Sequence, residues 1–157
     1  MIQLGDKIPA INITQITAEG QQTLPADQLF AAKKVVLFAV PGAFTPTCSA
    51  SHMPGYVVLA EQILAKGVDM IACVSVNDAF VMRAWGEAQN ATAIDLLADG
   101  GAAFTRALGL SMDTGEFGGI RSQRYAMVID QGIVTLLHVE APKTFEVSNA
   151  ETLLAAL

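Results

Sequence analysis

The stretch VVLFAVPGAFTPTC, residues 35–48, decides the fold of this chain. Its first six residues, 35–40, form a continuous apolar run rich in β-branched side chains, which is typical of a strand covered on both faces. After it, Thr45 is a preferred N-cap residue and Pro46 suits the first position of a helix. The stretch therefore predicts a buried strand that leads through a short loop into a helix, with Cys48 in the first helical turn.

The segments beyond this stretch predict an α/β protein. Residues 70–76 form a second apolar strand, and residues 46–66 have a helical pattern that is interrupted near Pro54. Two strands with a helix between them form a βαβ unit. We further expect a helix at 79–91, a strand at 94–97, a short helix at 101–108 closed by Gly109, a loop at 111–122, a hairpin of strands at 124–129 and 133–139, and a last helix that opens with capping-box spacing at 148–151.

This order of elements predicts a thioredoxin-like α/β sandwich. We expect a central mixed β-sheet flanked by helices, with an added N-terminal β-hairpin before the first core strand. A chain of 157 residues is long enough for one domain, so we assign residues 1–157 to a single domain.

Composition and charge exclude several classes of protein. Hydrophobic residues make up 52% of the chain and charged residues only 15%, which excludes a disordered chain. The net charge of −6 excludes a binder of nucleic acid or of anionic membrane surfaces. The six-residue apolar run is far shorter than the roughly 20 residues of a membrane span, and the first residues lack a secretory signal. We therefore expect a cytoplasmic protein, and the low charge content favours a homodimer.

Cys48 is the candidate nucleophile. The free N–H groups and the dipole of a helix start favour an anion, so we expect its sulfur as a thiolate. Position alone leaves a second interpretation open, because free cysteine is also a common buried apolar residue. The two cysteines and two histidines do not have zinc spacing, so no metal is expected.

A resemblance to a known family favours the reactive interpretation. Pro41, Thr45 and Cys48 match the Pro-x-x-x-Thr-x-x-Cys signature of the peroxiredoxins. The longer segment 41–55 resembles the type II branch, which includes the atypical, peroxiredoxin-five-like form of mammals. The likeness continues in residues 74–82, in Trp85 and in residues 119–125, and so spans most of the chain.

The resemblance implies a thiol peroxidase that needs no cofactor. Cys48 would attack the terminal oxygen of a hydroperoxide and become a sulfenic acid. The Thr45 hydroxyl would hydrogen-bond the thiolate and the peroxide, and Pro41 would shield the sulfur from water. Arg124, from the hairpin strand, would stabilise the thiolate and orient the peroxide, whereas we interpret Arg121 as structural.

Three further residues are assigned to substrate binding. The backbone N–H groups of Cys48 and Thr47 would hold the oxygen on which negative charge develops. Phe44 would line the entry for substrate or a contact between subunits, and Gly42 belongs to the same loop. We expect the dimer contacts in the loop at Phe44 and Thr45 and in residues 77–85.

The thiol that resolves the sulfenic acid is a separate question. The atypical mammalian form carries a resolving cysteine before its last helix, but residues 143–149 contain none. Cys73 has a spacing from Cys48 similar to that in plant-type members, yet it lies in an apolar strand where a thiol is buried and inert. We therefore predict that Cys73 mainly packs, and that an external thiol (glutathione, glutaredoxin or thioredoxin) reduces Cys48.

Other functions remain open at this point. A peroxide sensor or holdase would use the same Cys48, and a thioredoxin-like binding module would use none of this chemistry. A disulfide reductase is disfavoured because the chain has no Cys-x-x-Cys. A cysteine hydrolase would need His52 as its base, but such a base usually comes from another segment, so we interpret His52 as structural or at the pocket edge. His138 is expected to pack in its strand.

Overall fold

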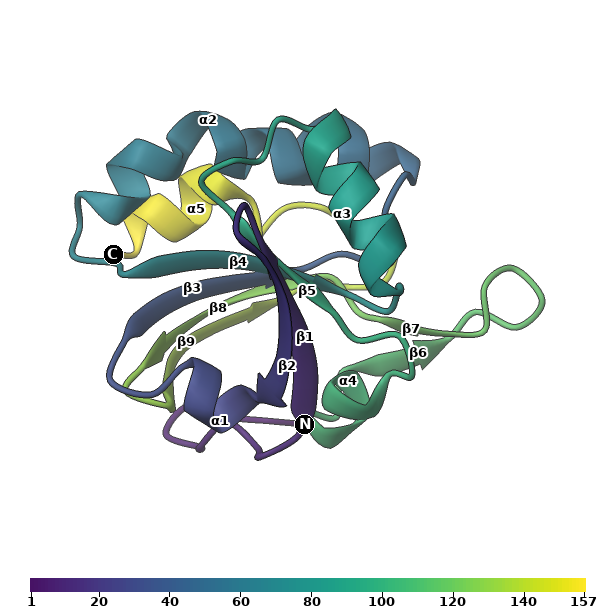
Figure 1. The fold of residues 1–157 in the computed structure, drawn as a ribbon, viewed down its shortest axis with the longest axis horizontal. Coiled ribbons are helices and arrows are strands. Elements are labelled where there is room, and N and C mark those ends of the chain that lie inside the picture. The colour runs from purple at the N-terminus through teal and green to yellow at the C-terminus, as the bar shows by residue number, and fades with distance from the viewer.

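The computed structural model describes residues 1–157 and contains two β-sheets. The strands are β1 (Asn12–Thr17), β2 (Gly20–Pro25), β3 (Lys34–Ala39), β4 (Met70–Ser75), β5 (Asp95–Ala98), β6 (Ser111–Asp113), β7 (Ile120–Ser122), β8 (Tyr125–Asp130) and β9 (Ile133–Val139). Seven of them form one mixed sheet in the order β2-β1-β5-β4-β3-β8-β9, and β6 pairs with β7 in the second sheet (Figure 1). Strand β3 pairs in parallel with β4 and antiparallel with β8, so both of these neighbours lie beside the first core strand.

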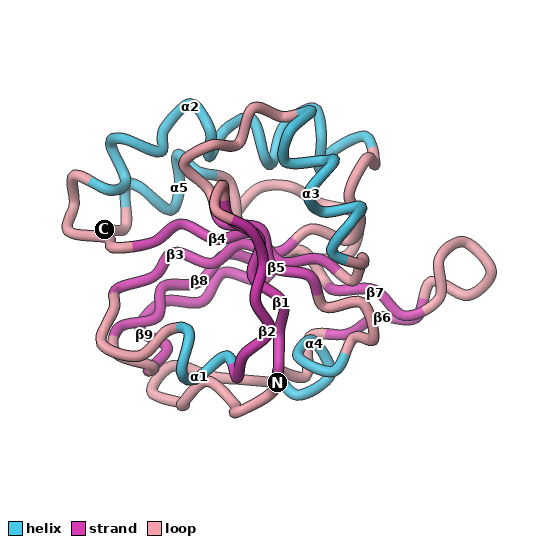
Figure 2. The backbone as a smooth tube through the Cα atoms, in the orientation of Figure 1, coloured by secondary structure: helices cyan, strands magenta, loops and turns pink.

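Helices cover both faces of the large sheet. The π-helix η1 (Cys48–His52) runs into α2 (Met53–Leu64), which lies with α3 (Ala79–Ala88) and α5 (Ala150–Ala155) on one face, while α1 (Ala26–Leu29) and α4 (Ala103–Ala107) lie on the other (Figures 1 and 2). The predicted thioredoxin-like sandwich is therefore confirmed. None of the helices has the length and apolar character that crossing a membrane requires.

The central strands are buried on both faces, as their unbroken apolar sequence predicts. Val36 and Phe38 of β3 enter the core under α2 and α3, whereas Val35 and Leu37 enter the core under α1 and α4. Alternate side chains of a strand point to opposite faces. In a strand between two helical layers both faces are buried, so every position favours an apolar residue. The expected N-terminal hairpin is present as β1 and β2.

Two of the expected elements differ from the structure. The loop expected at 111–122 contains the hairpin of β6 and β7, whose strands have three residues each and are too short to show a period in the sequence. The glycines of this segment lie in the connection between those strands. Helix α3 begins at Ala79 as expected, with Asp78 as its N-cap, but ends at Ala88 rather than at residue 91.

The predicted interruption near Pro54 takes the form of a π-helix. The chain is helical from Pro46 onward, as expected, and widens to a π-turn in η1. Proline has no N–H, and in a regular α-helix its ring would clash with the carbonyl four residues earlier. In the wider turn the N–H of Met53 bonds the carbonyl of Cys48, five residues earlier. Both Cys48 and His52, the first and last residues of η1, are fully buried.

The expected capping box at Ser148 is wrong. The N-cap of α5 is Asn149, whose side chain accepts a hydrogen bond of 2.8 Å from the N–H of Thr152. The Ser148 hydroxyl instead donates to the buried carboxylate of Glu140 at 2.7 Å. A carboxylate is the stronger acceptor, so it engages Ser148 and leaves the cap to the next residue.

Asn149→Ala should lower the free energy of unfolding by about 1 kcal/mol, because the Thr152 N–H loses its partner at the helix start. Asn149→Asp keeps a side-chain acceptor and should stay close to the wild type. Urea denaturation of the three proteins measures the difference. If Asn149→Ala were as stable as the wild type, the Asn149 side chain would not be the cap.

Candidate active site

Cys48 lies at the start of a helix, directly after the first core strand. Its side chain is fully buried, in the core between the sheet and the α2 layer. The N–H groups of Thr47 and Cys48 donate to no acceptor in the protein, because the first helical bond is from Ser49 N–H to the Thr45 carbonyl. These two free donors and the helix dipole make the site favourable for negative charge.

The guanidinium of Arg124 reaches this sulfur from a distant part of the chain. Arg124 immediately precedes β8, and Tyr125 pairs with Ala39 at the end of β3, so the sheet brings residue 124 beside the segment that leads to Cys48. Arg124 Nη2 lies 3.2 Å from Cys48 Sγ. Its other terminal nitrogen, Nη1, lies 2.8 Å from Nδ1 of His52. One planar cation thus bridges the sulfur and the imidazole.

The second arginine of this segment has a different place. Arg121 Nη1 donates to the carbonyl of Val76 at 2.8 Å, and its Nε donates to the carbonyl of Gly118 at 2.9 Å. These bonds hold the β6–β7 hairpin against the end of β4. The structure therefore brings Arg124, and not Arg121, to the sulfur of Cys48.

His52 is a neutral partner of Arg124. Nε2 of its ring lies 3.1 Å from the carbonyl of Ser148, so this nitrogen carries the proton and Nδ1 is left to accept from Arg124. Burial, followed by the nearby Arg124 charge, lowers the pKa of His52 from 6.5 to about 3. A ring that is neutral and engaged at both nitrogens has no proton-accepting site left for a hydrolase. It orients the arginine.

Glu140 organises the segment that His52 contacts. This carboxylate, at the end of β9, is buried at 6% exposure. It accepts hydrogen bonds at 2.8–3.0 Å from the consecutive backbone N–H groups of Glu146, Val147 and Ser148. The hydroxyls of Thr144 and Ser148 also donate to it, at 3.1 and 2.7 Å. Burial alone would raise the pKa of Glu140, but these hydrogen bonds lower it to about 2.

The segment held by Glu140 packs over the arginine and the histidine. The Ser148 carbonyl accepts from His52 and, at 2.8 Å, from the hydroxyl of Tyr56. The Phe145 ring centroid lies 5.7 Å from the guanidinium carbon of Arg124 and 5.0 Å from the His52 ring centroid. Arg124 is thus held between a sulfur, an imidazole and an aromatic face.

Thr45 closes a tight turn before the helix. Its hydroxyl donates to the Gly42 carbonyl at 2.6 Å and does not cap the helix, although the helix does begin at Pro46 as expected. Because that hydrogen is used, the oxygen of Thr45 is left to accept a hydrogen bond. A side chain at Gly42 would place its Cβ 3.2 Å from the Thr45 methyl carbon, so glycine leaves room for this turn.

A groove of about 640 Å³ leads to the site. Pro41, Thr47 and Arg124 line it, together with residues Met112, Thr114, Gln123 and 140–145. Of the expected substrate-binding residues, Phe44 and Gly42 do not line this groove. Phe44 has a left-handed backbone (φ 62°) and a side chain that is 57% exposed. Cys48 itself is covered and contacts the groove through Arg124.

Cys73 is as buried as Cys48 but lies in a strand and not at the start of a helix. It is the fourth residue of β4, is fully buried and is not disulfide-bonded. Burial, followed by the proximity of Cys48, raises the pKa of Cys73 well above its ordinary value. Its buried place in a core strand agrees with the sequence-based expectation, and no helix start lies at this position.

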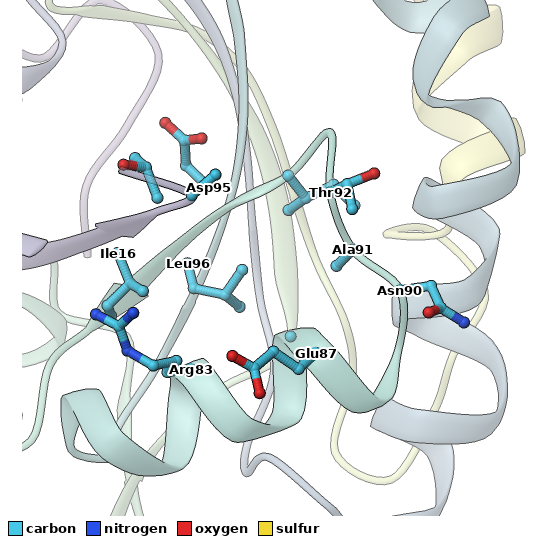
Figure 3. Close-up of a pocket in the computed structure, with 12 residues that line it drawn as sticks. Ile16, Arg83, Glu87, Asn90, Ala91, Thr92, Asp95 and Leu96 are labelled. Atoms are coloured by element: carbon cyan, nitrogen blue, oxygen red, sulfur yellow. The ribbon is translucent and has the colours of Figure 1, made fainter. Parts of the chain in front are cut away.

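A second hollow, of about 390 Å³, lies between α3 and the ends of β1 and β5 (Figure 3). Arg83 and Glu87 come from the helix, and Asp95 comes from the strand side. Burial raises the pKa of Asp95, and a hydrogen bond from Gln15 at 2.8 Å opposes this. The hollow shares no residue with the groove at Arg124.

His52, Glu140 and Phe145 surround the arginine, and no sequence pattern predicted that they do. A lone histidine one turn after a cysteine is compatible with many roles, and an acid after an apolar strand is common. The signal that was available was the pair of hydroxyl residues Thr144 and Ser148, which follow Glu140 within one short segment. It points to a carboxylate with local hydrogen bonds but not to what that segment covers.

The fold, the cysteine at a helix start and the adjacent arginine define a redoxin-type thiol protein. The family profile described as Redoxin matches residues 3–154. "Peroxiredoxin-2E-2, chloroplastic" of Oryza sativa subsp. japonica is 50% identical over 99% of this chain and 72% of its own length. "Peroxiredoxin-2D" of Arabidopsis thaliana is 46% identical over 99% of this chain and 98% of its own length.

Solved structures agree with these relatives. The crystal structure of reduced Prx3 from Vibrio vulnificus in complex with H2O2 is 68% identical, with a TM-score of 0.96 over 99% of both chains. That of peroxiredoxin 5 from Alvinella pompejana is 35% identical, with a TM-score of 0.86 over 99% of this chain and 97% of that one. The chain therefore belongs to the peroxiredoxin family, in its type II branch. Its activity is that of a thiol-dependent peroxidase.

His52→Gln should flatten the acid limb of the stability curve. Between about pH 6.5 and pH 3 the unfolded chain binds a proton on His52 that the folded protein does not bind, so this stabilisation is complete above that window and is lost as the pH falls. The free energy of unfolding of the wild type should therefore fall more steeply than that of the variant, by up to about 1.4 kcal/mol per pH unit. Urea denaturation at several pH values measures both slopes.

The matched control for this experiment is His138→Gln, which removes the other histidine. It should retain the steep wild-type slope. Equal slopes for the wild type and His52→Gln would contradict a neutral, buried His52.

Proposed function

We propose that Cys48 reduces hydrogen peroxide and alkyl hydroperoxides through a sulfenic acid on its own sulfur, and that Thr45, Arg124 and Pro41 form the catalytic site around it. The contact of 3.2 Å between Arg124 Nη2 and Cys48 Sγ carries this proposal. A fixed cation beside a sulfur at a helix start stabilises the thiolate, which is the nucleophilic form of cysteine. Pro41 lines the groove beside this site and limits the access of water.

The chemical step is a displacement on oxygen. The Cys48 thiolate attacks the terminal peroxide oxygen, the S–O bond forms and the O–O bond breaks. The sulfur loses two electrons and becomes a sulfenic acid, and the peroxide leaves as an alkoxide or hydroxide that takes up a proton. The free N–H groups of Thr47 and Cys48 stabilise the oxygen on which this charge develops.

Thr45 and Arg124 orient the peroxide for this step. Because the Thr45 hydrogen is donated to Gly42, its oxygen accepts the hydrogen bond from the peroxide O–H. The fork of Arg124 donates to the peroxide oxygens as well as to the sulfur. Met112 and Phe145 give the groove apolar walls, which supports alkyl hydroperoxides in addition to hydrogen peroxide.

An external thiol then regenerates Cys48. A first thiol attacks the sulfenic acid, forms a mixed disulfide and releases water, and a second thiol frees Cys48 as it forms an external disulfide. We assign this role to glutathione, glutaredoxin or thioredoxin, because burial in a core strand and a raised pKa disfavour Cys73 as the resolving thiol. The need for a constant supply of reduced thiols supports a cytoplasmic location.

We also propose that the protein is a homodimer. Phe80 on the first turn of α3 is 81% exposed, Phe44 before η1 is 57% exposed and Phe117 in the β6–β7 connection is 86% exposed. These elements lie at the same end of the molecule (Figure 1). Exposed aromatic side chains gathered at one end support a subunit contact that includes the expected regions at Phe44 and at residues 77–85.

Cys48→Ser should abolish peroxide consumption, because it removes the nucleophile, whereas Cys73→Ser should retain turnover within about threefold of the wild type. Steady-state peroxide consumption is measured separately with glutathione, glutaredoxin and thioredoxin as reductants. Loss of turnover in Cys73→Ser comparable to that in Cys48→Ser would show that Cys73 resolves the sulfenic acid. A wild type that reacts once and stops with every reductant would show a sensor instead.

Phe80→Glu should shift the protein from dimer to monomer, because it places a charge in the apolar contact. Sedimentation velocity at several concentrations measures the mass. Val58→Glu, at a position on α2 that is 77% exposed, is the matched control and should remain dimeric. A wild type that sediments as a monomer at all concentrations would refute the dimer.

A further inference from the structure

The corner between β4 and α3 holds the turn that carries Thr45. The N–H of Ala43 donates to Oδ1 of Asn77 at 3.0 Å, and the hydroxyl of Ser75 lies 2.6 Å from the same oxygen. A backbone N–H can only donate, so the side-chain atom that faces Ala43 must be the oxygen of the amide. The Ser75 hydroxyl must then donate as well, and the orientation of the Asn77 amide is determined.

The hydrogen bonds to the Asn77 side chain connect the turn to the centre of the sheet. Ser75, the last residue of β4, is fully buried, and its carbonyl accepts the N–H of Asp99 at 3.0 Å. The Asn77 side chain is therefore tied through Ser75 to the two parallel strands β4 and β5. The turn before η1 lies outside any strand or helix, so the hydrogen bond to Asn77 fixes its backbone together with the burial of the Ala43 side chain in the core.

The turn at residues 42–45 has a strained backbone, so contacts with other segments are needed to stabilise its conformation. Phe44 adopts a left-handed backbone conformation (φ 62°), which is unfavourable for a bulky L-residue. The internal bond from Thr45 to the Gly42 carbonyl closes the turn but does not attach it to the sheet. The hydrogen bond from the Ala43 N–H to Asn77 is the polar contact that links the turn to the end of β4.

We propose that Asn77 is a positioning residue for the reaction with peroxide. It fixes the turn through Ala43 and so places the Thr45 oxygen where it accepts the peroxide O–H. This rests on the role of Thr45 proposed above. The partner of the sulfur is independent of Asn77, because Arg124 comes from the segment before β8 and is held by His52. Loss of Asn77 therefore impairs peroxide orientation more than it impairs the thiolate.

The test compares two reactions of the same sulfur in Asn77→Ala. The rate constant for oxidation of Cys48 by hydrogen peroxide should fall about 10- to 100-fold, because the accepting oxygen is displaced. The rate constant for alkylation of Cys48 by iodoacetamide, which needs no Thr45, should stay within about threefold of the wild type across the pH profile. Single-turnover kinetics measures both, in a Cys73→Ser background so that one thiol reacts.

Two further variants separate positioning from general destabilisation. Asn77→Asp retains a side-chain oxygen for Ala43 and should restore most of the peroxide rate when the thiolate is fully formed. Asp78→Ala removes the adjacent cap of α3, whose oxygen accepts from Val81 N–H at 2.9 Å, and should lower stability but not the peroxide rate. Sedimentation confirms that each variant has the wild-type assembly state.

The proposal is overturned if Asn77→Ala oxidises as fast as the wild type, if its peroxide and alkylation rates fall together, or if Asp78→Ala reproduces its loss. Failure of the proposed function would give a different result. If the protein were not a peroxidase that uses Cys48, then Cys48 of the wild type would also be oxidised slowly by peroxide.

Discussion

The contact between the Arg124 guanidinium and the Cys48 sulfur is the interaction on which the site depends. It joins residues 76 positions apart, and it exists because β8 lies antiparallel beside β3. A cation placed at a helix start meets the same negative charge that the helix dipole favours, so two independent electrostatic effects act on one atom. Because Cys48 is buried, little water screens this interaction.

A half-buried arginine needs partners for its remaining donors, and the fold supplies them in a chain. His52 stays neutral because burial and Arg124 oppose its protonation, and a neutral ring can accept from the guanidinium. Its other nitrogen donates to the Ser148 carbonyl, whose segment is ordered by the Glu140 carboxylate. Each group restricts the next, so the arginine is presented to the sulfur in one orientation.

Sequence patterns predicted what depends on neighbours along the chain. The doubly buried strands, the start of α3, the β8–β9 hairpin and the helix start at Pro46 all follow from local periodicity and turn chemistry. Strands β6 and β7 were not predicted, because three residues are too few to show the alternation of a strand. The cap of α5 was assigned to Ser148 because local spacing cannot show that Glu140 competes for its hydroxyl.

By itself the sequence determined a thioredoxin-like sandwich and a cysteine at a helix start with the signature of a peroxidase. The strands, the helices and the position of the cysteine follow from side-chain period, capping and the free N–H groups of a helix end, whereas the peroxidase signature rests on the resemblance to peroxiredoxins. Only the tertiary structure decided that His52 is neutral and accepts from Arg124, that Glu140 orders the segment which packs over both, and that the side-chain oxygen of Asn77 accepts from the Ala43 N–H. These are contacts between distant segments, and strand order and register decide which of several equivalent side chains meet.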